Sequence, residues 1–210
     1  MKKNHEGIKR KYGGVRASIR KDERRKKLMA AGLSAFGTTG YAKTSIKSIC
    51  ELAGLTERYF YESFKNKEEL LALVYNKVVD ELTEKALEIL NQPDPISLEA
   101  VMEAVQGHFE TFQENPEKAR VLYFEVLGVS PGIDHEYRSA TDRLENIISL
   151  AISKAFPSID IKALQNSITP TALAGAVNLV VERWVLDGFE TPLQDILSQI
   201  EFFLKPRPGF

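Results

Sequence analysis

Apolar side chains recur at helical spacing along most of the chain, with polar residues between them. Within 46–53 they stand at i, i+3, i+4 and i+7, which predicts a short helix with Thr44 as its N-cap. A second short helix is expected over 56–64. A longer apolar stripe predicts a helix that Asn66 caps and that ends near Leu90. No stretch alternates with period two, so the expected fold is all-α.

The N-terminal segment has a different pattern. Residues 1–20 contain glycines and many charges but no periodic apolar face. We therefore expect a flexible basic arm over 1–21. The first helix is expected to begin at about Asp22, to bury a side that includes Leu28 and Phe36, and to end near Gly37.

Prolines divide the rest of the chain. Pro93 and Pro95 end the long helix, and further helices are expected near 97–114 and 134–155. Three more helix starts share a capping side chain followed by proline, at Asn115-Pro116, Thr169-Pro170 and Thr191-Pro192. A bundle of about five helices follows. The predicted division is an arm (1–21), a small helical domain (22–67) and a larger helical domain (68–210).

The two short helices within 44–67 have the sequence form of a helix-turn-helix. Ala53 is small where the helices must approach, and Gly54 can adopt the positive φ that turns the chain. Phe60 and Phe64 fall on one side of the second helix, which predicts that they anchor it.

The opposite side of that helix presents Arg58 and Glu62, flanked by Tyr59 and Tyr61. Such a set suits a DNA major groove, where Arg58 can pair bidentately with guanine and Tyr59 can contact a base edge. Hydroxyl and ammonium groups near helix ends suit phosphates. The alternative is a helical hairpin with a solvated charged face.

Charge is divided unevenly along the chain. Residues 1–67 hold 17 Lys/Arg against 6 Asp/Glu, and the remainder holds 11 against 23, so a net charge of −1 conceals a strongly basic N-terminal third. This distribution is typical of a polyanion-binding region. A basic arm on an anionic membrane surface is the competing interpretation, although the segment lacks the Trp or Phe face of such anchors.

Composition narrows the function further. With 43% apolar and 27% charged residues, the chain is typical of a soluble protein, and no signal peptide or membrane span is expected. Cys50 is the single cysteine, which excludes a disulfide framework, and a cytoplasmic location follows. His5, His108 and His135 share no metal spacing, and no Gly-rich phosphate loop occurs. We predict no enzyme activity, no cofactor and no metal.

The run from Leu28 to Leu71 resembles the DNA-binding domain of the TetR family of transcriptional regulators. The matching positions are Phe36, Gly40, Thr44, Ile46, Ile49, Ala53, Gly54, Thr56, Phe60, Tyr61, Phe64, Lys67, Glu68 and Leu70. The resemblance implies a homodimer that binds a palindromic double-stranded DNA operator, usually as a repressor, and leaves it when a small ligand occupies the C-terminal domain. An activator of the same fold is the alternative.

The resemblance also implies roles for individual residues. Thr44 and Ser45 would contact phosphate at the start of the second helix, Glu57, Arg58 and Tyr59 would stand at recognition positions, and Tyr61 and Lys67 would contact phosphate. Thr56 is a further expected DNA-binding residue. Common members have a small residue in place of Arg58 and threonine in place of Tyr59, so we expect an uncommon operator. The arm either reaches an adjacent minor groove or remains a tail that adds nonspecific charge.

The pattern of apolar residues from 169 to 204 predicts a pair of buried helices. Residues 169–187 are apolar nearly all round, and the following helix, to Leu204, carries an apolar stripe. The pair either packs a monomer core or, as the resemblance implies, forms a dimer interface over about 169–204. Aromatic and apolar positions expected around a pocket for a hydrophobic effector are Phe109, Phe112, Tyr123, Phe124, Leu127, Tyr137, Leu144, Ile148 and Trp184. The polar candidates there are His108, Glu125, Asn178 and Arg183.

Overall fold

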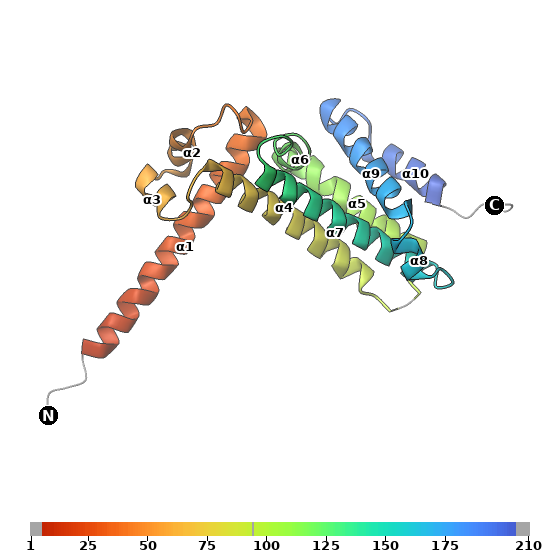
Figure 1. Ribbon diagram of the computed structural model, residues 1–210, viewed down its shortest axis with the longest axis horizontal. Helices are drawn as coiled ribbons and strands as arrows, with labels where there is room; N and C mark the ends of the chain where they lie inside the picture. The colour runs from red at the N-terminus through yellow and green to blue at the C-terminus, as the bar shows by residue number, and fades with distance from the viewer. Residues whose placement is uncertain (1–5, 94, 205–210) are drawn as a thin grey trace. The chain divides into compact units, whose positions relative to one another are not determined.

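The computed structural model describes the backbone over residues 6–93 and 95–204, and the side chains from residue 18 onward. Within these ranges it contains ten helices and no strand (Figure 1). The helices are α1 (Glu6–Thr39), α2 (Ile46–Ala53), α3 (Glu57–Tyr61), α4 (Lys67–Leu90), α5 (Leu98–Glu114), α6 (Pro116–Tyr123), α7 (Pro131–Ala155), α8 (Ile161–Gln165), α9 (Thr169–Leu186) and α10 (Leu193–Leu204). The prediction of an all-α fold is confirmed.

The chain forms two compact units, Met1–Val74 and Tyr75–Phe210. The boundary lies seven residues after the predicted one, because the first two turns of α4 pack with the N-terminal helices. Leu70 and Leu71 of α4 are fully buried, and a Cβ added to Gly32 of α1 would lie 2.9 Å from a methyl carbon of Leu70. Gly32 thus lets α1 and α4 approach closely.

The flexible arm expected over 1–21 is wrong for residues 6–21, which are the N-terminal half of α1. Residues 1–5 lie outside the described part of the chain. No proline interrupts 6–39, and lysine and arginine are good helix formers, so the packed second half of α1 can extend its helix backward. Gly13 and Gly14 weaken this extension by about 1 kcal/mol each relative to alanine but do not end it.

The first unit is built around the C-terminal half of α1, against which α2 and α3 pack while its N-terminal half runs beyond them (Figure 1). Leu28 and Phe36 from α1, Ile49 from α2, and Phe60 and Phe64 at the second short helix are buried together as its core. The helix-turn-helix pattern is therefore confirmed. α3 is shorter than the predicted 56–64, because the chain leaves the helix after Tyr61.

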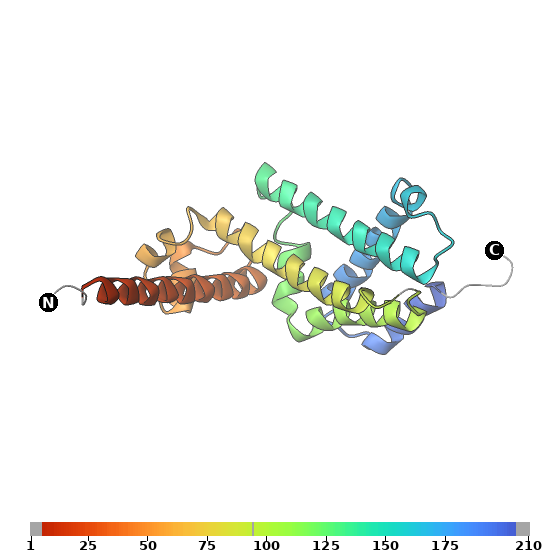
Figure 2. The same ribbon diagram turned by 90° about the horizontal axis from the view of Figure 1, so that it is seen from below.

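The second unit is a bundle in which α9 packs on α6, α7 and α8, while α5 packs on α6, α7 and α10 (Figures 1 and 2). Pro116 and Pro170 stand in the first turns of α6 and α9 as predicted, whereas α10 begins at Leu193, after Pro192. Within the described ranges, no helix combines the length and apolar character needed to cross a membrane.

Candidate DNA-binding surface and ligand cavity

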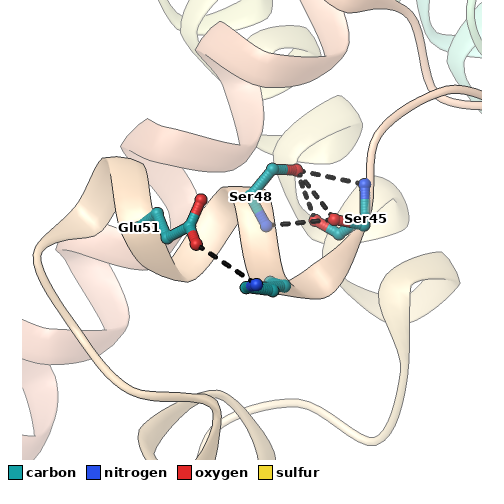
Figure 3. Close-up of polar contacts among 4 residues, drawn as sticks. Ser45, Ser48 and Glu51 are labelled. Atoms are coloured by element: carbon teal, nitrogen blue, oxygen red, sulfur yellow. Dashed lines mark hydrogen bonds and ion pairs between the residues drawn. The ribbon is translucent and has the colours of Figure 1, made fainter.

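The start of α2 is fixed by two serines rather than by Thr44. Ser45 is the N-cap, and its hydroxyl accepts a hydrogen bond from the N–H of Ser48 at 3.0 Å. The Ser48 hydroxyl accepts one from the N–H of Ser45 at 3.1 Å, which completes a capping box (Figure 3). The prediction of Thr44 as N-cap is wrong. Ser45 is exposed at this helix end, as its predicted phosphate role requires.

Thr44 and Lys67 are engaged inside the first unit. The Thr44 side chain is 4% exposed, and its hydroxyl donates to the carbonyl of Gly40 at 2.7 Å. The Lys67 ammonium donates to the carbonyls of Tyr41 and Thr44 at 2.7 and 2.8 Å. Burial lowers the pKa of Lys67 below its usual range. Both residues hold the loop between α1 and α2, and their phosphate contacts stay predictions.

The outer side of α3 is open as the helical wheel predicted. Thr56, Glu57 and Arg58 are exposed, Tyr61 is 58% exposed, and Phe60 is fully buried beneath them. Gly54 at the turn before α3 adopts φ +64°, and its N–H bonds to carbonyls of the last turn of α2. The glycine turn and the Phe60 anchor together aim the polar side of α3 outward.

Two arginines of α1 that the sequence pattern did not single out extend this surface. The Arg24 guanidinium lies 4.4 Å from the centre of the Tyr59 ring, and Arg25 donates to the carbonyl of Ser63 at 2.7 Å. Glu62 accepts from Arg58 at 3.2 Å and pairs with Arg24 at 3.6 Å. These exposed ion pairs contribute little stability but restrain how the guanidinium groups point. The sequence signal for these two arginines is the spacing of basic residues in α1, where Arg20 and Lys21 stand three to five positions before Arg24 and Arg25. This spacing indicates a basic side of the helix but not the contact with Tyr59.

The second unit contains a cavity of about 990 Å³ that is partly open to solvent, with exposed residues such as Val180 and Phe203 in its wall. α4 lines it with Tyr75, Val79, Leu82 and Ala86, and α5, α7, α9 and α10 supply most of the rest of its wall. The lining is largely apolar. A cavity of this size and character suits a drug-sized or lipid-like molecule.

The structure divides the predicted pocket residues into two groups. His108, Tyr123, Tyr137, Leu144, Ile148 and Asn178 line the cavity. Phe109, Phe112, Phe124, Leu127, Trp184, Glu125 and Arg183 do not. Phe109, Phe112 and Trp184 fill the core beside the cavity instead, and the Trp184 indole donates to the carbonyl of Thr191 at 2.7 Å. Leu127 is exposed, in the connection between α6 and α7.

Two polar side chains of the cavity wall form a pair. The His108 Nε2 and the Tyr123 hydroxyl lie 3.3 Å apart. Burial lowers the pKa of His108 to about 4 and raises the pKa of Tyr123. Both side chains are therefore uncharged near neutral pH.

Residues 28–74, which include α2, α3 and the exposed residues of α3, match the model of the bacterial regulatory proteins of the tetR family. The chain belongs to the TetR family of transcriptional regulators. It is accordingly a DNA-binding helix-turn-helix regulator of transcription, and the resemblance that the sequence indicated is confirmed.

Relatives of this TetR-family chain extend the similarity beyond the first unit. The transcriptional activator FasR of Mycolicibacterium smegmatis is 25% identical over 150 residues, which cover 70% of this chain and 68% of FasR. The fatty acid degradation regulator FadR of Bacillus halodurans has the same fold, with a TM-score of 0.72 and 17% identity over 88% of this chain and 97% of that one. FadR of Bacillus subtilis, solved in complex with stearoyl-CoA, matches with a TM-score of 0.70 and 17% identity over 85% and 96%.

Proposed function

We propose that this TetR-family regulator is a homodimeric repressor that binds a palindromic operator and leaves it when a small hydrophobic effector fills the cavity. The observation that carries the proposal is the pairing, in one chain, of an exposed recognition helix with an apolar cavity of about 990 Å³. α4 belongs to both units and lines the cavity from Tyr75 onward. A ligand that favours one packing of the second unit can therefore displace α4 and the recognition helix with it.

A long acyl chain is the effector class that the cavity suits best. Its wall is mostly aliphatic, with side chains from six helices that can line a flexible apolar chain. FadR of Bacillus subtilis, which shares the fold, was solved with stearoyl-CoA. We therefore propose acyl-CoA or a related acyl compound as the effector.

The dimer interface is proposed at the exposed apolar residues of α9 and α10. Leu179, Val180, Leu186, Phe202 and Phe203 are large hydrophobic side chains left exposed in the single chain. Apolar patches of this kind mark association sites. A two-fold pair can present two recognition helices about 34 Å apart, which matches successive major grooves on one side of a duplex.

The experiment that tests this function begins with selection of bound sequences from random duplexes. We expect an inverted repeat to be enriched, and acyl-CoA to release the protein from it in a fluorescence anisotropy titration. Failure to enrich any sequence would contradict sequence-specific binding. An operator complex unaffected by every ligand that occupies the cavity would contradict the coupling.

Activation of transcription is the second candidate, and one finding favours it: the relative FasR is a transcriptional activator. In vitro transcription from a promoter that carries the selected operator separates the two. A repressor lowers the transcript level and the effector restores it. An increase on adding the protein would establish activation.

Arg58 is expected to determine one operator position in each half-site. Its side chain is exposed on the outer side of α3, where it pairs with Glu62. Loss of a bidentate base contact costs about 1–3 kcal/mol, so Arg58→Ala should weaken binding to selected operators and relax the preference at one position. Repeated selection with the variant measures this. Arg138→Ala, which removes an exposed positive charge from α7, is the control and should leave the preference unchanged.

The N-terminal half of α1 is expected to contact DNA phosphates rather than to enter the minor groove. An α-helix about 10–12 Å across does not fit a minor groove about 6 Å wide. Replacing Lys9, Arg10, Lys11 and Arg16 with glutamine keeps the length of α1 and removes four charges. The salt dependence of binding should become shallower by about 0.9 for each phosphate that the variant no longer neutralises.

The control for this variant is its sequence preference, which should match that of the unmodified protein. An unchanged salt dependence would contradict phosphate contact by this part of α1. Competition by a minor-groove-binding drug against the unmodified protein, but not against the variant, would support the groove-binding interpretation.

A further inference from the structure

The cavity has polar groups but no basic side chain to receive an anion. Among its lining residues, all within the described part of the chain, there is no lysine or arginine, and the one carboxylate is Asp195 of α10, which is exposed to solvent. The remaining polar groups are hydroxyls, amides and one imidazole, in residues such as His108, Tyr123 and Asn178. A ligand carboxylate buried against this wall is costly unless a cation or several hydrogen bonds compensate for its lost hydration.

The His108–Tyr123 pair determines what the wall can offer a ligand. A neutral imidazole and a phenol together carry two donor hydrogens, and their mutual hydrogen bond at 3.3 Å uses one of them. Whichever group donates, one N–H or O–H remains. His108 also meets the Phe112 ring edge to face at 4.9 Å, and Tyr123 packs on the same ring, so both side chains are held in place. The pair therefore has one donor hydrogen left for a ligand in a cavity whose wall is largely apolar.

We propose that the His108–Tyr123 pair donates a hydrogen bond to an uncharged carbonyl of the ligand, so that the cavity selects the ester or thioester of an acyl chain over its free carboxylate. This rests on the proposed function, because it assumes that the cavity is the effector site. A neutral carbonyl needs one donor and leaves no charge unpaired. A carboxylate bound at the pair would meet an uncharged histidine, and the wall supplies no basic side chain to neutralise it.

The test uses the full-length protein and three ligands with the same twelve-carbon chain: dodecanoic acid, methyl dodecanoate and dodecanoyl-CoA. Displacement of a fluorescent apolar dye from the cavity gives each dissociation constant at pH 7.5. We expect both the methyl ester and the CoA thioester to bind about tenfold or more tightly than the acid, by the cost of burying an unpaired carboxylate. The methyl ester shows that the preference comes from the carbonyl and not from the CoA moiety.

The double variant His108→Phe, Tyr123→Phe removes both donors. It should lower affinity for the ester by about two- to tenfold, the usual range for one hydrogen bond, and should leave affinity for dodecane unchanged. Tyr137→Phe is the matched control, because it removes a phenol hydroxyl elsewhere in the wall and should leave affinity for the ester unchanged. If the double variant does not fold, the ligand series on the unmodified protein still decides whether the cavity prefers an uncharged carbonyl to a carboxylate.

The outcomes separate this inference from the proposed function. Equal or tighter binding of the acid would overturn the selection for uncharged carbonyls while leaving the cavity as the effector site. Unchanged affinity of the double variant for the methyl ester would overturn the role of the pair. If neither the dye nor any of the three ligands binds, the effector site itself is wrong and the inference with it.

Discussion

Replacing Leu179 and Phe202 with glutamate is expected to abolish operator binding. Each side chain is 56% exposed in the single chain, one on α9 and one on α10. In a two-fold dimer each patch packs against its own copy, so the variant would bury four unpaired carboxylates at one interface. A monomer retains one half-site, and affinity should fall about 10³-fold or more, toward that of nonspecific binding. Sedimentation and fluorescence anisotropy measure the two effects.

The control is a second pair of exposed apolar residues in the same unit, outside α9 and α10. Leu127 and Ile159 meet this requirement, and glutamate at both should leave assembly and operator affinity unchanged. Neither Leu179 nor Phe202 lines the cavity, so ligand binding by the first variant reports that the unit is folded. A dimer that survives the first variant would place the interface elsewhere. A monomer with unimpaired affinity would refute the use of two half-sites.

The helix-turn-helix was predictable because its determinants are local. Phe60 and Phe64 lie four positions apart, so the helical period alone placed them on one side and Arg58 on the other. Gly54 marked the turn because few other residues adopt positive φ at low cost. Each of these inferences needs only the chain within a few residues of the site, and each is confirmed in the burial and backbone angles of the first unit.

The loop contacts of Thr44 and Lys67 were not predictable, since the groups that engage them depend on how distant parts of the chain fold together. The Lys67 ammonium bonds to carbonyls 23 and 26 residues earlier. A hydroxyl or ammonium near a helix end has the same appearance in sequence whether it binds phosphate or satisfies a loop carbonyl. Arg24 was missed for the same reason: its contact with Tyr59 depends on how α1 and α3 pack.

The cavity shows a further limit of sequence patterns. Periodicity identifies which side of a helix is apolar, but not whether that side meets a neighbour or a space. His108 and Phe109 are adjacent, yet His108 lines the cavity while Phe109 packs on Trp184 with ring centres 5.7 Å apart. The contribution of α4 to the wall was missed because its apolar stripe has the pattern of ordinary core.

Lys67→Met is expected to destabilise the first unit and thereby to weaken DNA binding. Methionine keeps the length and apolar stem of lysine but leaves the carbonyls of Tyr41 and Thr44 without their donor. The ammonium also lies 4.2 Å from the Tyr41 ring centre, and the variant removes this cation–π interaction. We expect the free energy of unfolding to fall by about 2–4 kcal/mol, measured by urea denaturation.

A phosphate contact would give the opposite combination of results. It predicts unchanged stability and a salt dependence of binding that is shallower by about 0.9, whereas a loop-holding lysine predicts lower stability and an unchanged salt dependence. Lys65→Met is the matched control, because Lys65 is exposed two residues earlier and its side chain carries the same charge. Its replacement should leave stability unaltered. Lys67 joins the α1–α2 loop to the first turn of α4, and later residues of α4 line the cavity. Lys67→Met should therefore also reduce the release of DNA by effector.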